Sequence, residues 1–146
     1  MDPDNPIVKL CVNGMKAESE GRMDDAVLLF VQAWEQSKND FEACIAAHYV
    51  ARHQKTLEET LHWNNEALER ANAVNDERVH SFYPSLYLNL GKAHEDLGNW
   101  EQAKRHYELA AAKMSSLPLE GRYGDVVRDG IKRGAAASPL ICRLYT

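Results

Sequence analysis

One pattern of glycine, alanine and aromatic residues occurs three times along this chain of 146 residues. The clearest copy is Leu86–Ala110. The second copy lies 43 residues earlier in the chain and the first copy a further 34 residues earlier, and both have small or apolar residues at the corresponding positions. Within each copy these residues recur every three or four positions, as on one face of a helix, and a short break falls in the middle. The pattern therefore predicts three pairs of antiparallel helices, since a period of this length indicates a repeat fold.

The breaks carry helix-end signals. In the third copy Gly98 is suited to end one helix and Asn99 to cap the next, with Gln102 three residues later; in the second copy Thr56 and Glu59 match a capping box. We expect helices near residues 6–20, 23–37, 40–54, 57–73, 81–97 and 100–114, and a seventh near 122–133.

The third copy is preceded by additional residues, which fall around Ala71–Tyr83. This insertion predicts longer helices on either side of a turn at Asn75 and Asp76. Pro84 must then lie in an opening turn or at a kink, because proline cannot donate a backbone hydrogen bond inside a helix.

Composition places the chain near the average for one globular domain, with 45% hydrophobic and 27% charged residues. The formal net charge is -5, and 17 basic residues are scattered among 22 acidic ones, which argues against a nucleic-acid partner. No apolar run is long enough to span a membrane and no signal peptide is recognisable, so we expect a cytoplasmic protein without a membrane partner. The 3 cysteines are widely spaced, which favours reduced thiols over a disulfide framework or a zinc site.

The third copy resembles the tetratricopeptide repeat, a pair of helices with a usual period of about 34 residues. The residues at the family's signature places are Tyr87, Leu90, Gly91, His94, Gly98, Trp100, Ala103, Tyr107 and Ala110. The first copy keeps Leu10, Gly14, Ala17, Gly21, Ala26, Phe30 and Ala33. The second copy departs most from the family pattern. His48 and Lys55 stand in place of two glycines, Thr60 stands in place of an alanine, and Asn64 stands in place of an aromatic residue.

The resemblance implies an all-α fold, a right-handed solenoid of helical hairpins. Its three repeats would cover about residues 7–39, 41–74 and 84–116, and a capping helix near 122–133 would complete a domain of residues 1–134, followed by a tail of residues 135–146. The longer third repeat is similar to extended repeats of bacterial regulatory proteins, so a small bacterial member of the family is expected. No repeat ends in the family's usual proline, which leaves the superhelical pitch open.

No arrangement of residues in the sequence indicates catalysis. His94, Glu95 and Asp96 are consecutive, so they point about 100° apart on a helix and cannot converge on a metal ion. His48 and His53 also miss the spacing of a helical metal site. With no nucleophile elbow and no phosphate-binding loop, we expect no enzymatic activity, no metal and no cofactor.

The resemblance further implies a binding site for a protein or peptide, because in this family the first helix of each pair lines a concave groove. The matching residues are Cys11, Val12, Met15, Ile45, Tyr49, Arg52, His53, Leu88, Asn89, Lys92 and Glu95. An equally open alternative is that they pack against neighbouring helices. Some members hold a chaperone's C-terminal carboxylate with Lys, Arg and Asn on these helices. Here the matching places carry Cys11, Met15, Ala46, Ser85 and Asn89, so that only Asn89, with Lys92 or Arg52, could serve, and no such clamp is expected.

The sequence thus favours a non-catalytic scaffold or adaptor that binds a protein or peptide. The alternative is a structural protein that forms a homodimer through a repeat edge or through the tail. The tail carries Leu140, Ile141, Leu144 and Tyr145, which are costly to leave in water. It could fill the groove of its own chain or of a neighbour, or stay disordered.

Overall fold

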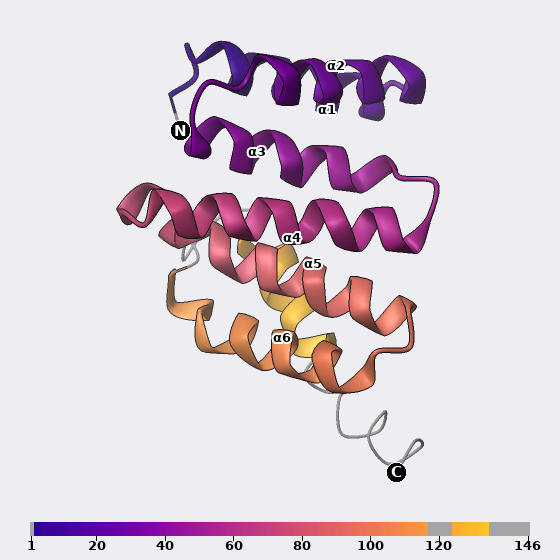
Figure 1. Cartoon of the computed structure of the whole chain (residues 1–146), viewed down its shortest axis with the longest axis vertical. Helices are drawn as coiled ribbons and strands as arrows, with labels where there is room; N and C mark the ends of the chain where they lie inside the picture. Colours follow the sequence, from indigo (N-terminus) through magenta and orange to yellow (C-terminus); the bar gives the residue numbers. More distant parts are fainter. Residues whose placement is uncertain (1, 117–123, 135–146) are drawn as a thin grey trace. The chain divides into compact units, whose positions relative to one another are not determined.

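The computed structural model describes residues 2–116 and 124–134, and all regular structure among these residues is helical. The α-helices are α1 (Pro6–Ser19), α2 (Met23–Gln36), α3 (Asp40–Val50), α4 (Leu57–Val74), α5 (Tyr83–Asp96) and α6 (Trp100–Ala112), with a further helix over residues 124–134 (Figure 1). Short 3-10 helices are η1 (Ala51–His53), η2 (Glu77–Phe82) and η3 (Met114–Ser116). The all-α prediction and the predicted helices are confirmed. None of the described helices is long and apolar enough to cross a membrane.

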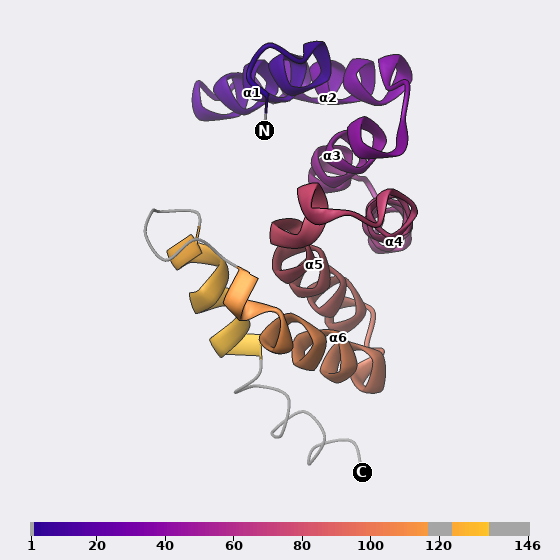
Figure 2. The same cartoon turned by 90° about the vertical axis from the view of Figure 1, so that its left-hand side faces the viewer.

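The helices belong to two compact units, Met1–Asn75 and Asp76–Thr146. In the first unit α1 packs against α2, α3 packs against α4, and α3 also contacts α1 and α2. In the second unit α5 packs against α6, and Figure 2 shows the helix of residues 124–134 (yellow) beside this pair. Each copy of the sequence pattern therefore folds as one helical hairpin.

Glycine makes the turn in the first and third hairpins. Gly21 and Gly98 each have a φ of 77°, a left-handed conformation that glycine adopts without steric cost. The N–H of Arg22 donates to the Ala17 carbonyl over 2.9 Å, and Asn99 makes the equivalent bond after Gly98. This bond, with one from the glycine N–H, forms a Schellman motif that satisfies the last carbonyls of the helix.

The predicted caps are only partly right. Thr56 caps α4, since its hydroxyl accepts a hydrogen bond from the Glu59 N–H over 3.1 Å. Asn99 occupies the N-cap position of α6 but makes no capping hydrogen bond with its side chain. Its Nδ2 instead lies 3.3 Å from Nδ1 of His94, so a side chain of the preceding helix competes with the cap.

The insertion forms a separate 3-10 helix, η2. Asn75 ends α4 with a φ of 48°, and Asp76 begins η2 by accepting a hydrogen bond from the Arg78 N–H over 2.9 Å. Pro84 lies in the opening turn of α5, where its missing N–H leaves no bond unmade. The expected lengthening is right for α4, which has 18 residues, and wrong for α5, which has 14.

An aromatic ring from the second helix of a hairpin packs against a glycine of the first. A Cβ atom at Gly14 would lie 2.3 Å from the Phe30 ring, and one at Gly91 would lie 2.6 Å from the Tyr107 ring. Phe30 is 1% exposed and Tyr107 is 2% exposed. These two pairs therefore set how closely the helices of each hairpin approach one another.

The helix of residues 124–134 covers one side of the α5–α6 hairpin. Its Val127 and Ile131 are buried and form a cluster with Ala110, against which Leu88 packs. A Cβ atom at Gly130 would lie 2.8 Å from a Leu88 methyl group, so the glycine permits this close approach. The helix thus shields apolar surface of the last hairpin from water.

We expect Gly14→Ala to lower the free energy of unfolding by about 2 kcal/mol, because the added methyl group would overlap the Phe30 ring and overpacking costs about 1–3 kcal/mol. Urea denaturation measures the loss. Phe30→Leu should tolerate the same alanine better, and Asn13→Ala on the exposed side of α1 should change stability by less than about 0.5 kcal/mol. Equal losses from Gly14→Ala in the parent chain and in the Phe30→Leu variant would show that the ring does not set the spacing.

Candidate functional site

The predicted groove residues are divided between the two units. Cys11, Val12, Met15, Ile45, Tyr49, Arg52 and His53 belong to the first unit, and Leu88, Asn89, Lys92 and Glu95 belong to the second. In the first unit Cys11 is 2% exposed and Ile45 is 5% exposed, so both are core residues. Met15 and Tyr49 are half-buried and pack on one cluster that contains Phe30.

Stacked rings connect the core of the first unit to its surface. The Phe30 ring stacks on Tyr49, with centroids 5.2 Å apart, and on the imidazole of His53, with centroids 6.1 Å apart. The guanidinium carbon of Arg52 lies 5.7 Å from the centroid of the Tyr49 ring. Stacking and cation–π attraction of this kind favour a fixed orientation of these side chains.

Glu18 contacts both the Arg52 guanidinium and the His53 imidazole at the end of α3. Its Oε2 lies 3.1 Å from Nη2 of Arg52, and its Oε1 lies 2.5 Å from Nε2 of His53. The Glu18 side chain is 12% exposed, so these contacts are shielded from water more than a surface ion pair is. Glu18 comes from α1, whereas Arg52 and His53 come from η1, and the three residues therefore tie α1 to the end of α3.

The sequence prediction placed Arg52 and His53 in the site but missed Glu18. A signal for it existed, because Glu18 precedes Arg52 by 34 residues, one repeat period, and so occupies the same position in the preceding repeat. Residues at equivalent positions of neighbouring first helices can face one another when those helices pack, as α1 and α3 do.

We call Val12, Met15, Tyr49 and Arg52 the first-unit face. Val12 is 51% exposed, and Met15 lies one helical turn further along α1. The Arg52 side chain is 46% exposed and lies over the half-buried Tyr49 ring. The first-unit face thus combines the apolar surface of Val12 and Met15 with the Arg52 guanidinium, which contacts Glu18 and the Tyr49 ring.

In the second unit the predicted residues are largely engaged within the chain. Leu88 packs beneath the helix of residues 124–134, and Lys92 pairs with Asp96 over 2.6 Å. Glu95 accepts a hydrogen bond from the Tyr107 hydroxyl. Burial, and then this hydrogen bond to a carboxylate, raises the pKa of Tyr107.

The two cysteines of the described residues are not activated as nucleophiles. Burial raises the pKa of the Cys11 and Cys44 thiols to about 12, so both stay protonated at neutral pH. His94 is half-buried and stacks on His106 with centroids 5.1 Å apart. Burial, and then the neighbouring His106, lower the pKa of His94. Within residues 2–116 and 124–134, no three His, Cys, Asp or Glu side chains are grouped as metal ligands would be.

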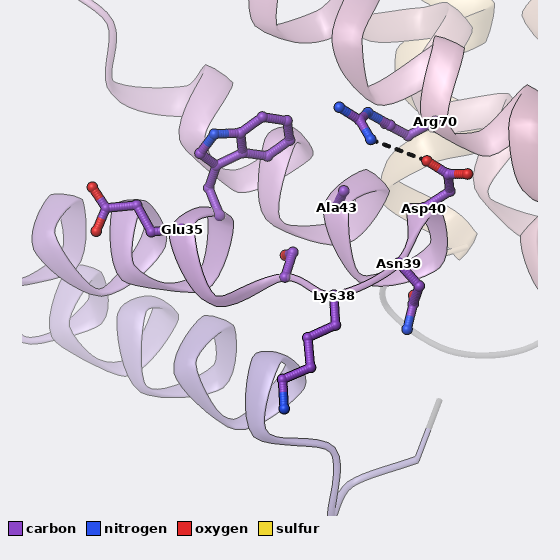
Figure 3. A pocket seen from close by; sticks show the side chains of 8 residues that line it. Glu35, Lys38, Asn39, Asp40, Ala43 and Arg70 are labelled. Carbon is purple, nitrogen blue, oxygen red and sulfur yellow. Dashed lines mark hydrogen bonds and ion pairs between the residues drawn. The ribbon is translucent and has the colours of Figure 1, made fainter.

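A hollow of about 470 Å³ lies where α2 ends, α3 begins and α4 passes (Figure 3). Its lining residues, none of them predicted, are Trp34, Glu35, Ser37, Lys38, Asn39, Asp40, Ala43 and Arg70. Arg70 contacts Asp40 over 3.0 Å and Glu66 over 2.8 Å, and it lies 5.4 Å from the Trp34 ring centroid. In Figure 3 Arg70 points toward Asp40 while Lys38 points away from both. Within the lining of the hollow, the positive charge of Arg70 is thus paired with the negative charge of Asp40.

Comparison of the chain with protein-family models, with curated proteins and with solved structures found no match. Inferences about function therefore come from the residues and the geometry described above.

We expect Glu18→Gln to lower the free energy of unfolding by about 1 to 2 kcal/mol, because Arg52 and His53 lose a shielded carboxylate that both contact. Lys92→Gln, which removes an exposed ion pair, is the matched control and should cost less than about 0.5 kcal/mol. Chemical denaturation measures both variants. Equal effects would mean that Glu18 behaves as an ordinary surface carboxylate.

Proposed function

We propose that the chain is a tetratricopeptide-type, non-catalytic scaffold that binds a protein or peptide along the first helices of its repeats. Three helical hairpins, each coinciding with one copy of the sequence pattern, support this proposal. Support also comes from the glycine–aromatic contacts of the first and third hairpins. The right-handed solenoid, the bacterial origin and the adaptor role belong to the same proposal.

The observation that carries the binding role is the first-unit face. Rigid contacts lower the entropy that is lost on binding, so a surface whose side chains are already oriented binds more tightly than a flexible one. Here the Phe30 ring and the Glu18 carboxylate orient Tyr49 and Arg52 from below. Val12 and Met15 would supply apolar contact, and the guanidinium of Arg52 would fix the direction of the bound peptide.

A selection of displayed random peptides on the full chain tests this proposal. We expect bound sequences with an apolar anchor, and Val12→Glu should weaken their binding at least about tenfold, because it places a charge in the apolar contact. Leu28→Glu, at an exposed apolar position of α2 outside the face, is the control and should leave the affinity unchanged. Calorimetric titration measures both variants. Failure to select any binder, or equal losses in both variants, would contradict the proposal.

Self-association remains a second candidate because of α2. Leu28 is 62% exposed and Val31 is 37% exposed, and residues three apart share one face of a helix. This exposed stripe is the kind of repeat edge through which the expected homodimer could form. The tail predictions concern residues 135–146, which lie outside the described residues.

If α2 mediates self-association, the mass measured by light scattering should rise toward that of a dimer over a tenfold increase in concentration. Leu28→Glu should then keep the chain monomeric, because a charge on each copy would have to be buried. Val12→Glu should leave the mass unchanged. A constant monomer mass for the full chain would remove this candidate.

A further inference from the structure

The outer side of α1 carries a valine between two lysines. Lys9, Val12 and Lys16 are three and four residues apart, so they lie on one exposed face of the helix. Neither lysine forms an ion pair within the described part of the chain, and Glu20, four residues after Lys16, pairs with Arg22 over 2.6 Å instead. We call Lys9, Val12 and Lys16 the basic stripe.

The outer side of α2 carries the opposite charges around its apolar residues. Asp24 precedes Leu28 by four residues and Glu35 follows Val31 by four, so these four exposed side chains share one face. Neither acid forms an ion pair among residues 2–116 and 124–134, and Figure 3 shows Glu35 directed away from Arg70. We call Asp24, Leu28, Val31 and Glu35 the acidic stripe.

Within one chain the two stripes point away from each other. Gly14 of α1 lies against the Phe30 ring of α2, which marks the sides on which these two helices meet. Val12 precedes Gly14 by two residues and Leu28 precedes Phe30 by two, so each is rotated by about 160° from the contact between the helices. The stripes therefore lie on opposite outer sides of the first hairpin, and only a second copy can bring them together.

We propose that the basic stripe of one copy packs against the acidic stripe of a second copy, so that chains associate head to tail. This inference rests on the second candidate function, self-association through α2, and names the surface that α2 contacts. Val12 belongs to both the basic stripe and the first-unit face, so the second copy covers part of that face.

The spacing of the charges agrees with this contact. The basic stripe places one lysine before and one after Val12, and the acidic stripe places one acid before Leu28 and one after Val31. When Val12 lies midway between Leu28 and Val31, each lysine is about 3 Å along the helix axis from an acid. The flexible stem of lysine spans such an offset, so both ion pairs can form in either relative direction of the helices.

Charge decides which stripes pair, since the apolar residues alone would allow any combination. A contact of α2 with α2 would place Asp24 and Glu35 beside the acids of the other copy in either relative direction, because both ends of the stripe are negative. A contact of α1 with α1 would oppose lysines in the same way. Like charges brought together are repulsive, so the contact of α1 with α2 is favoured over both symmetric contacts.

A contact between two different surfaces does not use up the binding capacity of either copy. Each associated chain keeps one free stripe, so further copies add until the chain closes into a ring or continues as a filament. The mass should therefore grow beyond that of a dimer. A contact made by single helices is small and hence weak, so sedimentation of the full chain should extend to about 1 mM.

Mixing two variants of the full chain tests the proposal. Val12→Glu spoils the basic stripe and Leu28→Glu spoils the acidic stripe, so each variant alone should sediment as a monomer. An equimolar mixture should form a dimer that does not grow, because each variant keeps the stripe that the other has lost. Val126→Glu, at an exposed valine of the second unit, is the matched control and should associate as the parent does.

The outcomes separate this proposal from the candidate function on which it rests. If Val12→Glu associates as strongly as the parent while Leu28→Glu does not, α2 pairs with α2 and the proposal fails, although self-association stands. If the full chain stays monomeric up to about 1 mM, both fail. If the mixture of Val12→Glu and Leu28→Glu stays monomeric while the parent associates, the proposal fails.

Exchange of the charges gives a second readout that leaves the apolar contact intact. Lys9→Glu with Lys16→Glu makes both stripes acidic, and Asp24→Lys with Glu35→Lys makes both basic. Each double variant alone should associate at least about tenfold more weakly than the parent, and an equimolar mixture should recover the association. Added salt should weaken the parent's association. A mixture no stronger than its components would contradict the proposal.

The same variants keep peptide binding distinguishable. Asp24→Lys with Glu35→Lys changes no residue of the first-unit face, so selected peptides should bind this variant with the affinity of the parent when both are dilute and monomeric. Unaltered peptide binding together with lost self-association would support the assignment of the acidic stripe. Circular dichroism should show the helix content of the parent in every variant, because all substituted residues are exposed.

Discussion

The close packing of an aromatic ring against a glycine of the partner helix is the contact on which the other features depend. At Gly14 and Gly91 there is no room for a side chain, because the rings of Phe30 and Tyr107 occupy the space. This contact lets the small residues of the repeat pattern lie where two helices meet. Large residues on both helices would push the two helices of a hairpin apart and expose the alanines that are now buried between them.

The candidate site is built outward from that packing. Phe30 is fixed by its own hairpin, and its ring supports Tyr49 and His53 of the next one. Arg52 lies over Tyr49, and Glu18 of α1 contacts both Arg52 and His53. The surface that we propose for binding is therefore a continuation of the core, and a change at Phe30 should alter it even though Phe30 itself is buried.

Helix positions could be predicted from the sequence because their ends depend on local chemistry. Gly21, Gly98 and Thr56 act within a few residues of their own position, and each does what its type favours. Exposure could not be predicted in the same way. Cys11 and Val12 are neighbours on one helix, yet the first is buried and the second is half exposed, because adjacent residues of a helix point in different directions and only one direction faces the core. The hollow beside Trp34 also escaped prediction, since it is formed by side chains from several helices.

The second repeat shows why matching residue by residue can mislead. Judged one position at a time, His48 and Asn64 are two departures from the pattern, and both weaken the resemblance. Judged as a pair of equivalent positions on the two helices, they exchange a large residue for a small one and leave the total volume similar. The physical cost is in polarity, since a half-buried imidazole and a buried amide replace a glycine and an aromatic ring. The repeat with the weakest sequence signal therefore still folds as a helical hairpin, with α3 packed on α4.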